Sequence, residues 1–263
     1  MGLASLFLSA SALADPAVAS RYYENGLKRF EQQDVAGAII QLKNALQEDR
    51  SMLAAHLLLA QAYLREGDVG PAEVAFREAL RLGVSRAEVA VPMARIYLLQ
   101  GRPSVLLETI AAEGLPAPTR LQVLTLRGTA QVALGKGAEA ESSFAEARAL
   151  DPASPLPPAA EVPMLIAGGR LDLALERAEL AVRHGPDFAP AFNARASVAH
   201  ARGDLAAALK DYERAVELDA GLVDAIVARA GILVDLGRDD EAQRFPGKLA
   251  DLVSPIGFHN QGF

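Results

Sequence analysis

Four histidines, His56, His184, His200 and His259, are the side chains of this 263-residue chain best suited to metal ligation or proton transfer near neutral pH. They show no HExxH motif and no paired-ligand spacing, so we interpret each as a surface or interface imidazole. The chain has no Cys, which excludes disulfides, thiol catalysis, cysteine-ligated metals and lipidation on cysteine. We expect no metal site and no cofactor.

Two tripeptides and the serines are the other groups with reactive potential. Gly135-Lys136-Gly137 lacks the upstream Gly and the following Ser or Thr of a phosphate-binding loop. Arg202-Gly203-Asp204 has the residues of an adhesion tripeptide. No G-x-S-x-G occurs, and nothing in the order of Ser, His and Asp indicates a catalytic triad. We predict that the chain is not an enzyme.

Both tripeptides contain a glycine that recurs with a constant period. The period is 34 residues, and the glycines are Gly67, Gly101, Gly135, Gly169, Gly203 and Gly237, with Gln33 one period earlier. A constant period in this range indicates stacked supersecondary units, each of which needs neighbours to bury its apolar face. Since Gly after a helix permits the left-handed conformation that ends it, we interpret both tripeptides as turns.

Other residue types keep the same register around each turn. Small residues let the two helices of a unit approach closely, and we expect one large apolar residue to fill the gap toward the next unit. Alanine stands five residues after the turn at Ala38, Ala72, Ala140, Ala174, Ala208 and Ala242, and twelve after it at Ala45, Ala79, Ala147, Ala181 and Ala215. A large apolar residue stands nine after it at Leu42, Phe76, Ile110, Phe144 and Tyr212, and a small one seven before it at Gly26, Ala60, Ala94, Gly128, Ala196 and Ala230.

This register resembles the tetratricopeptide repeat (TPR) family, whose helix–turn–helix unit has the same length. The resemblance implies an all-α fold, an α-solenoid of about seven TPR helix–turn–helix repeats in a right-handed superhelix, over residues 17–252. Pro163 predicts a kink near 155–163, either a hinge or a locally bent but rigid helix. Residues 253–263 show no repeat character and are expected to form an irregular tail.

Charge limits the kinds of partner. The net charge is −7, and Lys and Arg are scattered along the chain. Nucleic-acid binding requires a basic face that meets the phosphates, so we predict no nucleic-acid partner.

The N-terminal residues 1–14 indicate a leader. Residues 2–14 are apolar or small and end in Ala12-Leu13-Ala14, like the apolar region and cleavage site of a secretory signal peptide. They are too short for a transmembrane span. No Lys or Arg precedes them, so either the sequence starts inside the true signal peptide or the segment is only an apolar leader. A signal peptide predicts a periplasmic or envelope location, and the alternative predicts a cytoplasmic one.

The TPR resemblance also implies a binding surface, because the first helix of each unit lines the concave face of such arrays. The clamp of Lys, Asn and Arg with which TPR co-chaperones hold an acidic C-terminus is absent from the matching positions. We expect instead an extended peptide or helix held by apolar contacts and by amide or hydroxyl hydrogen bonds. The candidate partner-binding residues are Tyr23, Gln61, Arg65, Arg95, Gln122 and Asn193.

A narrower resemblance begins at Arg21. Tyr22-Tyr23 followed by the segment at 37–46, GAIIQLKNAL, is similar to the start of the TPR-repeat lipoprotein of the PEP-CTERM and exosortase system of Gram-negative bacteria. That family implies a role in envelope export or protein sorting beside exopolysaccharide synthesis, with envelope or exosortase components as partners. It carries a lipid-bearing Cys and many more repeats, and this chain has neither.

Three functions follow from these patterns. The first is a periplasmic scaffold for exopolysaccharide export or PEP-CTERM protein sorting. The second is another TPR adaptor, in outer-membrane assembly, cellulose export or the cytosol. The third is an accessory subunit that positions the catalytic part of an enzyme complex.

Overall fold

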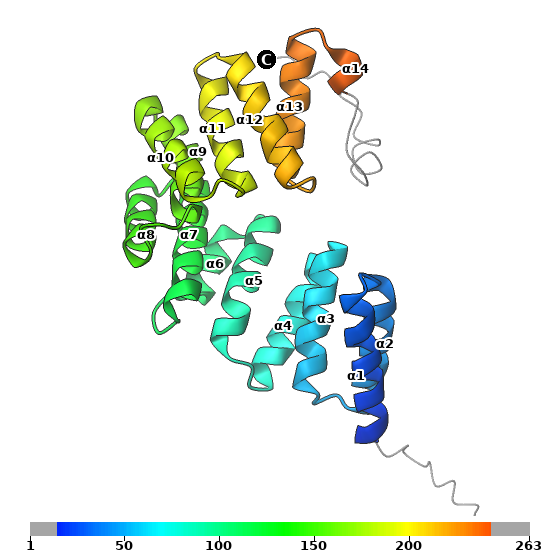
Figure 1. Ribbon diagram of the computed structural model, residues 1–263. Helices are drawn as coiled ribbons and strands as arrows, with labels where there is room; N and C mark the ends of the chain where they lie inside the picture. The colour runs from blue at the N-terminus through cyan, green and yellow to red at the C-terminus, as the bar shows by residue number, and fades with distance from the viewer. Residues whose placement is uncertain (1–14, 243–263) are drawn as a thin grey trace, which may run out of the picture. The chain divides into compact units, whose positions relative to one another are not determined.

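The architecture is helical throughout the residues that the computed structural model describes, 15–242. Within that range there are fourteen helices and no strands, joined as successive helix–turn–helix pairs (Figure 1). The predicted all-α solenoid of helix–turn–helix repeats is therefore confirmed. The leader predicted at 1–14, the end of the array at 243–252 and the tail predicted at 253–263 lie outside the described residues.

The chain divides into two compact units, Met1–Leu106 and Leu107–Phe263, called unit 1 and unit 2 below. Unit 1 contains α1 (Pro16–Glu31), α2 (Val35–Glu48), α3 (Leu53–Glu66), α4 (Val69–Arg81) and α5 (Arg86–Leu99), and α6 (Pro103–Thr109) spans the boundary. Unit 2 contains α7 (Ala117–Ala133), α8 (Gly137–Leu150), α9 (Leu156–Ala167), α10 (Leu171–His184), α11 (Ala189–Ala201), α12 (Leu205–Leu218), α13 (Val223–Asp235) and α14 (Asp239–Ala242). Repeat one is α1 with α2, repeat two is α3 with α4, and so on to repeat seven, α13 with α14.

The periodic glycines end the first helix of their repeats in the left-handed conformation. Their φ angles are positive, from 65° at Gly101 to 91° at Gly67. Gln33 takes the same conformation, with φ of 66°, at the position where repeat one has no Gly. The turn geometry inferred from the period is therefore confirmed, and it is kept even where the side chain adds strain.

We expect Gly203→Ala to lower the free energy of unfolding of unit 2 by about 1 kcal/mol, because φ of 81° strains any residue that has a Cβ. The matched variant Gly231→Ala, within α13 and with no atom within 4 Å of the added Cβ, should raise it by about 0.5–1 kcal/mol. Urea denaturation of both variants measures the difference. Equal effects of the two substitutions would contradict the role of the turn.

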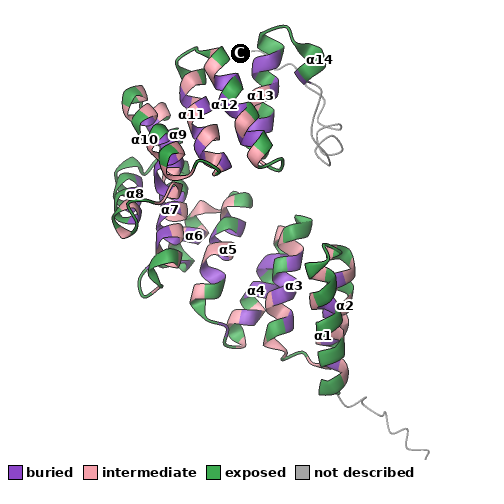
Figure 2. Cartoon of the chain, in the orientation of Figure 1, coloured by how far each residue is buried: buried purple, intermediate pink, exposed green. Residues whose placement is uncertain are grey.

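The in-register small and large residues form the interior of the repeats. The alanines five and twelve residues after the turns are inaccessible to solvent, apart from Ala242, which is 4% exposed. In repeat three, Leu106 takes the place of the alanine five residues after the turn and is also buried. The large apolar residues nine after the turn are also buried, with Leu42, Phe76 and Phe144 at 0%. Figure 2 shows this as buried helix sides turned toward neighbouring helices and exposed sides turned outward. The register therefore predicted the core correctly.

The closest approach of two helices in repeat four depends on a glycine. A Cβ added at Gly128 of α7 would lie 2.7 Å from the nearest ring atom of Phe144 on α8. Gly26 has the same relation to Leu42 in repeat one, at 2.9 Å. The small residue seven before the turn thus makes room for the large residue nine after it, within one repeat.

One buried carboxylate connects repeats four and five. Glu161 on α9 is 3% exposed and pairs with Arg148 of α8 and, at 3.2 Å, with Nε of Arg177 of α10. Pro163 lies two residues later on the exposed side of α9, which continues through it as one helix to Ala167. The hinge or bend that we predict near 155–163 stays a prediction.

Candidate functional site

The solvent-facing side of the first helices in unit 1 carries four of the six predicted partner-binding residues. We call the side of α1, α3 and α5 that bears Tyr23, Gln61, Arg65 and Arg95 the first-helix face. Gln61 and Arg65 are one turn apart on α3 and both are exposed, as expected for positions i and i+4 on one side of a helix. Tyr23 is half-buried on α1, which packs against α3.

Arg65 is held in place by the preceding repeat. Its Nη1 donates to the backbone oxygen of Phe30 at 3.3 Å, and its guanidinium carbon lies 4.1 Å from the centre of the Phe30 ring. A cation over an aromatic face keeps a preferred orientation while most of its N–H groups remain available. Arg65 is therefore a positioned donor on the first-helix face.

The α5 part of this face combines a cation with an exposed apolar side chain. Arg95 is exposed, and Leu99, one turn later, is 71% exposed. A leucine with that exposure contributes little to the core of its own unit. It gives the first-helix face an apolar contact point beside hydrogen-bond donors, the combination found at peptide-binding surfaces.

The other two predicted residues lie in unit 2 and are not brought together. Gln122 of α7 lines a 300 Å³ pocket with Leu121 and with Ser154 and Leu156 from the start of the next repeat. Asn193 is half-buried on α11, where its backbone oxygen accepts a hydrogen bond of 2.8 Å from the Ser197 hydroxyl. These two residues therefore mark separate places on unit 2, and their roles in binding stay predictions.

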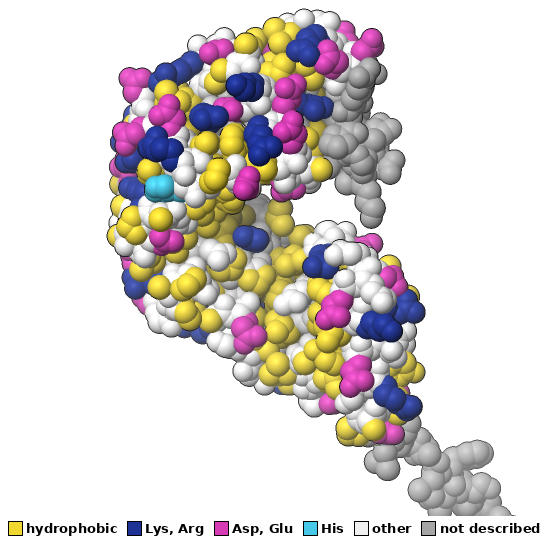
Figure 3. All heavy atoms as spheres, viewed as in Figure 1, with side chains coloured by type: hydrophobic (Ala, Val, Ile, Leu, Met, Phe, Trp, Pro, Cys, Tyr) yellow, Lys and Arg dark blue, Asp and Glu magenta, His cyan; other side chains and the backbone are white. Residues whose placement is uncertain are grey.

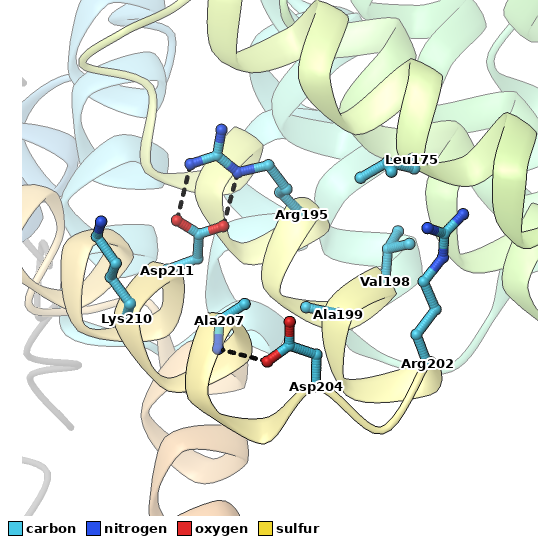
Figure 4. A pocket seen from close by; sticks show the side chains of 9 residues that line it. All are labelled: Leu175, Arg195, Val198, Ala199, Arg202, Asp204, Ala207, Lys210 and Asp211. Carbon is cyan, nitrogen blue, oxygen red and sulfur yellow. Dashed lines mark hydrogen bonds and ion pairs between the residues drawn. The ribbon is translucent and has the colours of Figure 1, made fainter.

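A second pocket of unit 2, of 340 Å³, lies among α10, α11 and α12 (Figure 4). Leu175, Val198 and Ala199 contribute its apolar side. Arg195 donates from Nε and Nη2 to the two carboxylate oxygens of Asp211, at 2.6 and 2.8 Å. The hydrogen bond to Asp211 raises the pKa of Arg195, so the guanidinium keeps its charge at this contact.

Sequence reasoning missed the ion pair in this pocket, although the register contains its signal. Arg195 stands eight residues before Gly203, and Asp211 stands eight after it. Glu161 and Arg177 occupy the same two positions around Gly169 with the charges exchanged. Opposite charges at equal distances before and after a turn therefore indicate a contact between the two helices of one repeat.

The described residues contain neither a cluster of three or more His, Cys, Asp or Glu side chains placed to hold a metal ion nor a helix long and apolar enough to cross a bilayer. On the face that Figure 3 shows, cations and anions are interspersed over both units, with hydrophobic side chains between them. This mixed surface is suited to contact with other proteins.

Comparison with known proteins identifies the repeat. Tetratricopeptide-repeat profiles match residues 29–90 and 189–221, one segment in each unit. A solved tetratricopeptide repeat protein from Parabacteroides merdae superposes with a TM-score of 0.68 at 18% identity, over 93% of this chain and 95% of that one. The chain has the tetratricopeptide-repeat fold. This fold typically serves as a non-catalytic scaffold for protein interactions.

Two further similarities are partial: one relative matches over about half of its length, and one solved structure shares the fold at low sequence identity. The chain is 42% identical over 97 residues to human tetratricopeptide repeat protein 36, a match that covers 35% of this chain and 51% of the relative. The chain thus spans about half the length of the curated relatives it matches. The structure of Pseudomonas aeruginosa pilF gives a TM-score of 0.57 at 20% identity, over 82% of this chain and 98% of that one, and so shares the fold.

Proposed function

We propose that the chain is a scaffold that binds an extended peptide or a helix along the first-helix face of unit 1. The observation that carries the proposal is the exposure of Leu99, at 71%, on the same helix side as the exposed Arg95. Exposed apolar anchors beside amide and guanidinium donors give affinity through burial and orientation through hydrogen bonds.

The binding test uses peptides selected on the purified chain from a random peptide library, with affinities measured by calorimetry. We expect Leu99→Asp to weaken the selected peptides by about tenfold or more, since it removes an anchor and leaves the fold intact. The control is Leu134→Asp, an exposed leucine of unit 2, which should leave affinity unchanged. Equal loss with both variants would remove support for this face.

We expect the same binding to depend weakly on salt, because apolar contacts supply the affinity and the two arginines are expected to donate to neutral acceptors. Raising the ionic strength from about 0.1 M to about 0.2 M should change the affinity by less than about twofold. A steep loss of affinity with salt would show that ion pairs dominate and would count against the proposed binding mode.

We further propose that this scaffold acts in the bacterial envelope, in exopolysaccharide export or PEP-CTERM protein sorting. The support is the leader-like segment 1–14 and the resemblance that starts at Arg21. Crosslinking in cells, followed by identification of the captured proteins from envelope extract, tests the proposal. Capture of exosortase-system or glycosyltransferase components is the expected result, and capture of cytosolic proteins alone would refute export.

A further inference from the structure

A pocket of 690 Å³ opens between the second helices of repeats one and two, on residues other than those of the first-helix face. Its apolar lining comes from Leu46 of α2, Leu59 and Tyr63 of α3, and Pro71, Val74 and Ala75 of α4. A volume of this size is in the range of pockets that accept large side chains or small ligands. We call it the second-helix pocket.

The second helices of these two repeats expose apolar residues where the later ones expose polar residues. Val74 is 68% exposed and stands seven residues after Gly67, and Ile40 is 58% exposed at the equivalent position after Gln33. The same register position in the next four repeats is exposed and polar: Glu108, Ser142, Glu176 and Lys210. The apolar character is thus specific to the helices beside the pocket.

The charge three residues after this position also differs between the first two repeats and the next four. This position is a cation in repeats one and two, Lys43 and Arg77, and is neutral or acidic in the next four repeats: Ala111, Ala145, Glu179 and Glu213. Lys43 lies over the Tyr63 ring, 5.6 Å from its centre, and makes no ion pair within residues 15–242. A cation therefore stands beside the apolar lining in a chain whose net charge is −7.

The carboxylates near the pocket do not cancel its cations. Glu73 is shared by Arg77 and Arg102, at 2.7 and 2.9 Å, so one carboxylate serves two guanidinium groups. Glu78 is taken by Arg81, whose Nε and Nη2 both donate to it, and this interaction lowers the pKa of Glu78 and keeps it ionised. The rim keeps a net positive charge.

We propose that the second-helix pocket, with Ile40 and Lys43 on α2, docks an acidic protein segment that inserts a leucine or aromatic side chain. The apolar lining receives the anchor, and Lys43 and Arg77 attract the flanking carboxylates. Burial of the exposed Val74 side chain supplies affinity, and the net positive rim selects acidic over basic partners.

The probe is a short fluorescein-labelled peptide with a Phe-x-x-Leu pair flanked by Glu, titrated with the whole chain by fluorescence anisotropy. Two control peptides replace either the Phe and Leu by Ser or every Glu by Lys. We expect the acidic anchored peptide to bind, and each control to bind at least about tenfold more weakly. Equal binding of the three peptides, or no binding of the first, would overturn the proposal.

Variants that restore the residues of later repeats give the matched test. Val74→Glu, the residue of repeats three and five, should weaken the acidic peptide by about tenfold or more, and Lys43→Glu should weaken it and flatten its salt dependence. Leu99→Asp, on the first-helix face, should leave this binding unchanged, which separates the two surfaces. Unchanged affinity with Val74→Glu would overturn the proposal. Self-association of the wild-type chain that Val74→Glu abolishes would also overturn it, because the occupant of the pocket would then be a second copy of the chain. Thermal unfolding confirms that each variant is folded.

Discussion

We expect Glu161→Gln to lower the free energy of unfolding of unit 2 by about 3 kcal/mol, and urea denaturation measures the loss. The reason is that Arg148 and Arg177, with side chains 25% and 20% exposed, would keep their charges without the carboxylate between them. Arg177 would then retain only its pair with the exposed Glu176. A glutamine fills nearly the same space but carries no charge, so the loss reports on charge compensation rather than on packing.

The matched control is Glu141→Gln in the same unit. Glu141 pairs with Arg170 between repeats four and five, but both side chains are about half exposed, at 46% and 49%. Water screens such a pair, so the substitution should change stability by less than about 1 kcal/mol. Similar losses for the two variants would refute a special role of the buried carboxylate.

Phe144→Ala is expected to cost unit 2 about 3–5 kcal/mol in free energy of unfolding. The ring is fully buried and faces Gly128 across the two helices of repeat four, where little can move in to fill the space. Denaturant midpoints for Phe144→Ala and for the control Leu134→Ala, whose side chain is 38% exposed, measure the effect, and the control should lose no more than about 1–2 kcal/mol.

A double variant tests the contact itself. Gly128→Ala alone should destabilise by about 1–3 kcal/mol, because the added Cβ meets the Phe144 ring. Once Phe144 is Ala, the same change should stabilise by about 0.5–1 kcal/mol, since Ala is the better helix residue. The same sign in both backgrounds would contradict the close approach.

The repeat boundaries and the core were predictable from the sequence because they depend on local register. Glycine is favoured at the left-handed turn residue of each repeat, and alanine is favoured where two helices lie close together. Each of these positions can therefore be assigned to the turn or the core without knowing the rest of the fold. Gln33 shows that this assignment held even where the preferred residue was missing, because the neighbouring helices impose the turn.

The candidate surfaces were only partly predictable. The contact of Arg65 with Phe30 depends on how one repeat is rotated on the next, which a periodic pattern does not specify. The second-helix pocket had a sequence signal, Ile40 and Val74 at one register position, but an exposed apolar residue in a periodic helix looks the same as a core residue until burial is known.

The exchanged charges of repeats five and six should disfavour wrong pairings of their helices during synthesis. If α12 replaced α10 as the hairpin partner of α9, Glu161 would face Asp211, and if α10 replaced α12 as the hairpin partner of α11, Arg195 would face Arg177. Two similar repeats that emerge one after the other, or that belong to two molecules, therefore repel when they combine wrongly. We therefore expect the two ion pairs to favour the correct pairing of helices within each repeat.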